Sequence, residues 1–200
     1  MNSVHMNMRK MPEQQGLGIH PKKFTVWLLI IGMIMLFAGF TSAYIVRRAE
    51  GNWFQFELPA MFTYTVIIAV LSSISMLWAQ RAAKRDELEQ VKLALGLTLA
   101  LGIAFCYGQY LAAVEMIDNG LYFVNNDMPS KISASFLYVI AGVHLAHIFG
   151  GLIYLTVMLV KSFQLKIHKK ATLGISMCAT YWHFVGILWI YLFLFLNFAR

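Results

Sequence analysis

The sequence contains few cysteines, prolines and charged residues. Two cysteines among 200 residues exclude a disulfide-rich scaffold and a zinc or haem site of the CxxC type. Four prolines and fourteen glycines are too few for a collagen-like or low-complexity disordered chain. Charged residues make up 12% of the chain, whereas soluble domains contain roughly 25%. An ordinary soluble domain is therefore excluded as well.

Long apolar segments dominate instead. Hydrophobic residues make up 60% of the chain, and its mean hydropathy is +0.65. A helix needs about 20 apolar residues to cross the hydrocarbon core of a bilayer. Five segments without Asp, Glu, Lys or Arg are long enough: residues 24–46, 59–79, 93–114, 136–160 and 173–199. The sequence predicts an all-α fold, with five transmembrane helices in one membrane domain (residues 24–200) after an N-terminal tail (residues 1–23).

The basic residues are distributed unevenly along the chain. Twelve of the sixteen Lys and Arg residues lie in the N-terminal tail and in the second and fourth loops between the spans. Loops rich in Lys and Arg stay in the cytoplasm, so we expect a cytoplasmic N-terminus and a C-terminus outside. The net charge of +7 then reflects topology, and nucleic acid is not expected as a partner.

Small residues recur at intervals of four in two predicted helices. Lipid tails are as apolar as leucine, so helices in a membrane associate where small side chains let their backbones approach closely. Both series predict helix-packing faces, and therefore tightly packed central helices. The members are Gly96, Ala100, Ala104, Gly108 and Ala112 in the third span, and Gly142, Ala146 and Gly150 in the fourth.

Three histidines lie inside the predicted helices. His144 and His147 share a face of the fourth span, and His183 lies at a similar depth in the fifth. Polar residues at this depth are costly and are therefore candidates for function. We favour neutral histidines that hydrogen-bond across helices or to lipid headgroups. The alternative is a small membrane redox protein whose three histidines bind haem or a metal, although no Asp, Glu or Cys stands at ligand spacing.

Two other polar residues belong to the third span. Gln109 lies inside it, and Glu115 closes it at the outer end, either exposed at the interface or bonded to a partner. The sequence shows no nucleophile with a base, no carboxylate pair and no phosphate-binding glycine loop, so we assign no catalytic residues. A small-solute transporter is a third class, but the absence of charge within the spans argues against it.

Two motifs in the last two spans resemble subunit III of the haem-copper respiratory oxidases. One is the run YWHFV at residues 181–185 followed by Trp189, and the other is GxHxxH at residues 142–147 followed by Gly150-Gly151. Five spans are similar to the short bacterial form of this subunit. The residues that we assign to structural, lipid-facing or partner-facing positions are Gln109, Glu115, His144, His147, Tyr181, Trp182, His183 and Trp189.

The resemblance implies a non-catalytic role in aerobic respiration. Subunit III of these oxidases carries no haem or copper, which lie in partner subunits. It packs on the catalytic subunit I, binds phospholipid, and sustains proton uptake and stability during turnover. We therefore expect a multi-pass protein of the bacterial inner membrane, in a cytochrome c oxidase or alternatively a quinol oxidase. An upstream quinol-oxidising complex is a further expected partner.

The sequence departs from the family pattern at several polar positions. Met33, in the first span, stands where many relatives carry a carboxylate. A proton-related role of that acid therefore does not transfer to this chain. Ala112 replaces an acid expected after Gln109. Gly186 stands where an Asp often occurs, and Tyr64 where an Asn often precedes Thr65. At these positions the chain is less polar than the family pattern.

Overall fold

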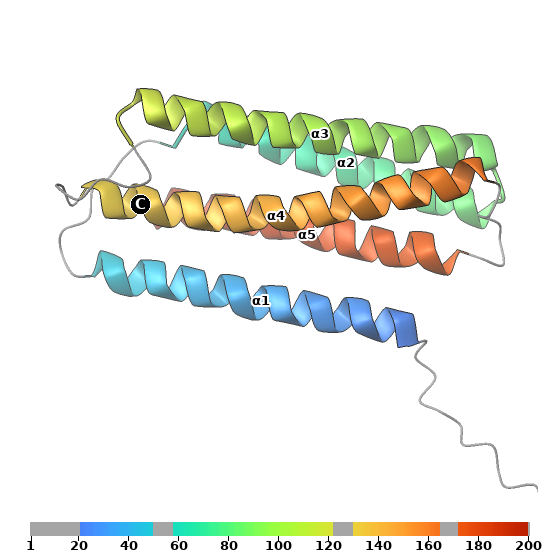
Figure 1. Cartoon of the computed structure of the whole chain (residues 1–200), viewed down its shortest axis with the longest axis horizontal. Helices are drawn as coiled ribbons and strands as arrows, with labels where there is room; N and C mark the ends of the chain where they lie inside the picture. Colours follow the sequence, from blue (N-terminus) through green and yellow to red (C-terminus); the bar gives the residue numbers. More distant parts are fainter. Residues whose placement is uncertain (1–20, 50–57, 122–129, 165–171, 200) are drawn as a thin grey trace, which may run out of the picture.

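The structure is a computed structural model that describes residues 21–49, 58–121, 130–164 and 172–199 (Figure 1). Most of the predicted tail lies outside the described residues. Each of the five helices is long and apolar enough to cross a membrane, and no strand occurs in the described ranges, so the predicted all-α fold is confirmed. The helices are α1 (Pro21–Arg48), α2 (Ala60–Lys84), α3 (Leu88–Asp118), α4 (Ser130–Phe163) and α5 (Leu173–Phe198).

The helices α3 and α4 continue beyond their apolar segments. The sequence predicts spans of 93–114 and 136–160, whereas the helices occupy Leu88–Asp118 and Ser130–Phe163. Long charged side chains can lie along a helix and reach water, so a helix need not end with its apolar run. Lys92 shows this: its Nζ lies 2.8 Å from Glu89 Oε1 and 5.6 Å from the ring centroid of Phe163, at the end of α4.

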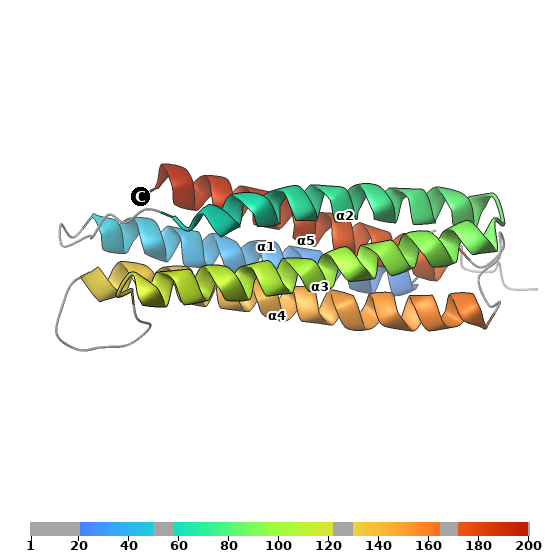
Figure 2. The same cartoon turned by 90° about the horizontal axis from the view of Figure 1, so that it is seen from above.

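A tight turn joins α2 to α3 into an antiparallel hairpin. Asp86, in this turn, has a φ of 63°, in the left-handed region that aspartate tolerates better than most residues. The Glu87 N–H donates to the carbonyl of Ala82 at 3.1 Å, which closes the end of α2. Because the connection is short, α2 and α3 pack along their lengths, as Figures 1 and 2 show.

The five helices lie nearly parallel to one another, with α1 at one side of the bundle (Figures 1 and 2). α2 packs on α3 and α5, α4 packs on α3 and α5, and α1 packs on α4 and α5. One stripe of α1 faces the bundle, at the three- and four-residue spacing of a helix face. Its buried residues are Ile30, Met33, Phe37, Thr41 and Tyr44.

Large apolar side chains cover the outside of the bundle. Met35 is 71% exposed, Ile153 is 67% exposed and Phe198 is 79% exposed. In a soluble protein such a surface would demand a covering partner, but the hydrocarbon of a bilayer solvates it without cost. The inner faces carry the polar groups, which places the candidate site among the packed helices.

Candidate functional site

Two indole-to-hydroxyl hydrogen bonds join α5 to α2. Trp182 Nε1 donates to Ser72 Oγ, and Trp189 Nε1 donates to Thr65 Oγ1, both at 3.2 Å. The two tryptophans are seven residues apart, and so are the two hydroxyls. Seven residues span about two helical turns, or ~10.5 Å, so the antiparallel helices meet through the same contact twice. The pair of bonds therefore fixes both the rotation and the axial register of α5 against α2.

The Thr65 hydroxyl is the junction of three helices. Besides the bond from Trp189, it accepts one from Gln109 Nε2 on α3 at 3.2 Å, and it donates to the carbonyl of Phe62 at 2.8 Å. A hydroxyl has two lone pairs and one hydrogen, so its bonding capacity is fully used. The side chain is completely buried. Gln109, predicted as a site residue, thus contributes to helix packing at this point.

Further polar contacts tie α4 to α5 and α2 to α3. Tyr181 Oη donates to the backbone carbonyl of His147 at 2.8 Å. Thr98 Oγ1 lies 3.1 Å from Ser75 Oγ, which donates in turn to the carbonyl of Ala94 at 3.0 Å. Hydrogen bonds between membrane helices are worth about 0.6 kcal/mol on average and up to about 1.7 kcal/mol. Several together supply specificity that apolar contacts with lipid-like side chains cannot.

His144 lies in an aromatic cage at the centre of the bundle. Its ring stacks on Trp189 with centroids 5.0 Å apart and 26° between the planes, and Phe37 and Phe105 each present an edge at 6.1 Å. The side chain is 1% exposed, and neither ring nitrogen has a hydrogen-bond partner among the described residues. The sequence predicts hydrogen bonds across helices for this residue, whereas ring contacts to α1, α3 and α5 hold it.

The other two histidines do not complete a ligand set with His144. His147 Nδ1 lies 2.8 Å from the carbonyl of Val143, so it bonds within its own helix, and its ring packs near Phe37 at 5.9 Å. His183 is half-buried on α5, and its Nε2 has no hydrogen-bond partner in the part of the chain that the structure describes. Among the described residues, no group of three His, Cys, Asp or Glu side chains could hold a metal ion. The geometry therefore gives no support to the redox alternative.

The indole of Trp182 fits between two glycines. A Cβ added to Gly102 of α3 would lie 2.9 Å from Trp182 Cη2, and one added to Gly151 of α4 would lie 3.0 Å from Cζ3. Non-bonded carbons lie at about 3.5–4.0 Å, so a larger residue at either position would displace the ring. The six-membered ring of Trp182 thus lies against Gly102 of α3 and Gly151 of α4, while its N–H binds α2.

The predicted series of small residues are only partly buried within the chain. Gly108 and Ala112 lie against neighbouring helices, and a Cβ on Gly108 would meet Thr65 Cγ2 at 2.7 Å. Gly102, which lies outside both predicted series, approaches neighbouring helices equally closely, since its added Cβ would lie 2.7 Å from Leu152 Cδ2. A packing role for the outward residues stays a prediction, and they would require a neighbour from outside the chain. The exposed members are Ala100, Ala104, Gly142, Ala146 and Gly150, while Gly96 has no atom within 4 Å of an added Cβ.

Sequence reasoning therefore finds part of this network. It singles out Trp182, Trp189 and Gln109 but assigns no contact between helices to Thr65 or Ser72. Both do bond their own helix, to Phe62 and Ala69, and in addition they accept from α3 or α5. The seven-residue spacing shared by the two pairs is the signal that could have revealed them. Glu115 lies half-buried in the last turn of α3, away from these contacts.

The chain is similar to known proteins over most of its length. The family model described as cytochrome c oxidase subunit III matches residues 14–199. The chain is similar to the cytochrome c oxidase subunit 3 of Corynebacterium diphtheriae, with 26% identity over 174 residues, 84% of this chain and 82% of the relative. It is 29% identical to the probable cytochrome c oxidase subunit 3 of Mycobacterium tuberculosis strain H37Rv, over 88% of this chain and 85% of the relative.

The similarity extends to a relative from outside the bacteria. The cytochrome c oxidase subunit 3 of Pongo abelii is 26% identical over 208 residues, which cover 96% of this chain and 72% of the relative. The bacterial relatives and the five membrane-spanning helices identify a multi-pass protein of the bacterial inner membrane. The resemblance expected from the two motifs is thereby confirmed, and the chain belongs to the cytochrome c oxidase subunit III family.

Proposed function

We propose that the chain packs on the catalytic subunit I of a proton-pumping cytochrome c oxidase, binds phospholipid, and sustains proton uptake and stability during turnover. Membership of the subunit III family makes other oxidase subunits its partners. The finer assignment rests on what the polar groups of the bundle do. It also agrees with the expectation from sequence that no catalytic residue belongs to this chain.

The observation that carries the proposal is the use of the intramembrane donors. The N–H groups of Trp182, Trp189 and Gln109 and the O–H of Tyr181 all donate to groups of the same chain. A transporter or catalyst needs polar groups directed at a substrate or ion at this depth. Here these groups hold helices together, which suits a subunit that supports a neighbour.

The outer surface suits the proposed partners. Apolar side chains on α1, α3 and α4 face outward at membrane depth, where only lipid or the helices of another chain can lie. The outward small residues of α3 and α4 would allow a neighbouring helix to approach closely. Haem and copper are expected in the partner subunits and not in this chain.

Purification of the tagged chain from its native membrane tests the proposal. A large haem-containing chain should co-purify in stoichiometric amount, and the isolated complex should oxidise cytochrome c. Deletion of the chain should leave the initial rate nearly intact and speed the loss of activity during turnover. Stoichiometric haem or metal on the isolated chain would instead support the redox alternative.

The electron donor and larger assemblies can be read from the same preparation. Oxidation of quinol but not of cytochrome c would replace the proposed complex with a quinol oxidase. A quinol-oxidising complex that migrates with the oxidase would show the upstream partner directly. Lipid extraction from the complex would show whether phospholipid is retained, and comparison with a complex lacking the chain would assign it.

A further inference from the structure

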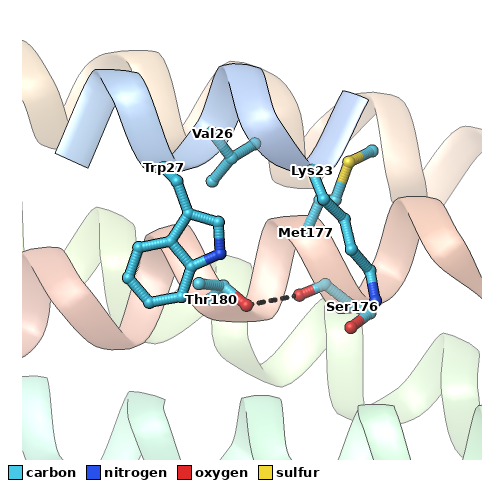
Figure 3. A pocket seen from close by; sticks show the side chains of 6 residues that line it. All are labelled: Lys23, Val26, Trp27, Ser176, Met177 and Thr180. Carbon is cyan, nitrogen blue, oxygen red and sulfur yellow. Dashed lines mark hydrogen bonds between the residues drawn. The ribbon is translucent and has the colours of Figure 1, made fainter. Parts of the chain in front are cut away.

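A cavity lies between the first turns of α1 and α5, and its lining resembles a binding site for an anion. Its volume is about 220 Å³, and it opens to the outside of the bundle. Lys23, Val26 and Trp27 line it from α1, and Ser176, Met177 and Thr180 from α5 (Figure 3). Both helices begin at the same end of the bundle, the end that carries the N-terminus of α1 (Figure 1).

The polar groups of the lining have hydrogen-bonding capacity to spare. Within the described part of the chain, neither the Lys23 ammonium nor the Trp27 indole N–H has a hydrogen-bond or ion-pair partner. The Ser176 hydroxyl accepts from Gln80 Nε2 at 3.5 Å, which leaves its own hydrogen to donate. Figure 3 shows the side chains of Lys23 and Trp27 directed from α1 toward α5. An ammonium, an indole N–H and a hydroxyl therefore line the same cavity as hydrogen-bond donors.

The charge of the lining selects for an anion. It contains one cation, Lys23, and no carboxylate. Thr180 differs from the donors, because its hydroxyl hydrogen is used in a 3.0 Å bond to the carbonyl of Ser176. It can accept a hydrogen bond from a ligand hydroxyl. An anionic group that also carries a hydroxyl would match all the polar groups of the lining.

The position of the cavity points to a lipid. It lies at the end of two membrane-spanning helices, at the depth where lipid headgroups lie. A tryptophan beside a lysine is typical of this interface. From Trp27 the same face of α1 continues through Ile31 and Ile34, which are half exposed and apolar, so acyl chains could follow it into the membrane.

We propose that this cavity binds the headgroup of an anionic phospholipid, with Lys23 and Trp27 of α1 and Ser176 of α5 donating to its phosphate. The volume admits a phosphodiester with a small polar substituent, but not the acyl chains. The bound lipid would then bridge α1 to α5. This inference rests on the proposed phospholipid-binding function and names the place and the class of lipid.

Titration of the purified, delipidated complex with dioleoyl phosphatidylglycerol, followed by native mass spectrometry, tests the proposal. Lys23→Gln should weaken binding about fivefold, the effect expected of one basic residue beside an anionic headgroup. Lys23→Arg should retain it, and Trp27→Phe, which keeps a smaller aromatic ring but removes the indole N–H, should also weaken it. Lys161→Gln, the matched control, removes the same charge from α4 outside the cavity and should change nothing.

Three results would overturn the proposal. The first is equal loss, or no loss, of phosphatidylglycerol in the Lys23→Gln and Lys161→Gln variants. The second is equally tight binding of dioleoyl phosphatidylcholine, which would show no selection for an anion. The third is displacement of the lipid by millimolar inorganic phosphate, which would identify a free anion as the ligand.

The same samples separate this inference from the proposed function. If the haem-containing chain co-purifies with every variant while lipid binding does not respond to Lys23, only the cavity assignment fails. If the wild-type chain binds the lipid as expected but has no oxidase partner, the proposed function fails and the cavity assignment stands.

Discussion

Gly102, which bounds the indole of Trp182, is a position where one added methyl group should be costly. In Gly102→Ala, the new Cβ would lie 2.7 Å from Leu152 Cδ2 and 2.9 Å from Trp182 Cη2. Both distances are about 0.6–0.8 Å shorter than the lower end of ordinary carbon contacts. Leu152 can rotate away. Trp182 cannot easily, because Gly151 bounds it on α4 and its N–H is bonded to Ser72.

The expected cost follows from two opposing contributions. Overpacking a buried site destabilises by about 1–3 kcal/mol. Replacing glycine by alanine in a helix returns up to about 1 kcal/mol through lower backbone entropy in the unfolded chain. Gly96→Ala on the same helix gains the second contribution alone, since no atom lies within 4 Å of its new Cβ. The difference between the two variants therefore isolates packing and should be about 1–3 kcal/mol.

These free energies of unfolding can be measured by titrating the purified chain, in detergent micelles, with SDS. Tryptophan fluorescence and circular dichroism monitor the unfolding. A double-mutant cycle with Trp182→Phe adds a direct test, because the smaller ring removes the atoms that meet the new Cβ. The pair should be more stable than the sum of the two single changes implies. Equal stabilities of Gly102→Ala and Gly96→Ala, or strict additivity in the cycle, would refute the tight packing of Trp182 against Gly102.

Three more predictions concern the polar network, with stability measured by the same titration. Thr65→Val should destabilise more than Ser72→Ala, because it strands two buried donors instead of one, at about 1–3 kcal/mol for each; equal losses would contradict this. Tyr181→Phe should lower the free energy of unfolding by about 1 kcal/mol, the value of its single hydrogen bond to α4. An unchanged free energy of unfolding would show that this bond does not stabilise the bundle. His144→Phe should be neutral or stabilising, because the imidazole nitrogens are unpaired and the cage is aromatic; a large loss would contradict the ring-contact assignment.

The spans could be predicted from sequence because a bilayer imposes a length and excludes charge. The predicted start of the second span, residue 59, and both predicted limits of the fifth, 173 and 199, lie within one residue of those of α2 and α5. The end of α2 at Lys84 and the limits of α3 and α4 could not be predicted in this way. Apolar length measures the hydrocarbon, whereas these helices continue through the interface, where Lys92 and Glu89 can reach water.

The small-residue series show where a pattern in sequence loses its spatial meaning. Residues four apart on a helix are rotated by about 40° relative to each other, so a series of five drifts by about 160° around the axis. Gly108 and Ala112 therefore face inward while Ala100 and Ala104 face outward. The buried positions Gly102, Phe105 and Gln109 follow the three- and four-residue alternation that keeps to one face.

Sequence reasoning missed the hydrogen bonds from α5 to α2 for a related reason. Ser72 and Thr65 can each satisfy their hydroxyl within α2, and they do so. Whether an indole also donates to them depends on the rotation of α5 about its axis, which the packing of the whole bundle sets. His144 shows the opposite case: its polarity suggests a hydrogen bond, but the residues that surround it are aromatic.

The weakest association in the bundle is expected to be that of α1, and this gives the proposed lipid a structural role. In the part of the buried stripe from Ile30 to Thr41, the Thr41 hydroxyl binds the carbonyls of Phe37 and Ala38 in the same helix. From Ile30 to Thr41, α1 therefore meets its neighbours through apolar and ring contacts. Lipid tails replace apolar contacts at little cost, whereas they cannot replace the bonds between α2 and α5. A headgroup that binds Lys23 and Trp27 to Ser176 of α5 would add a polar contact at the end of α1 that precedes this stretch.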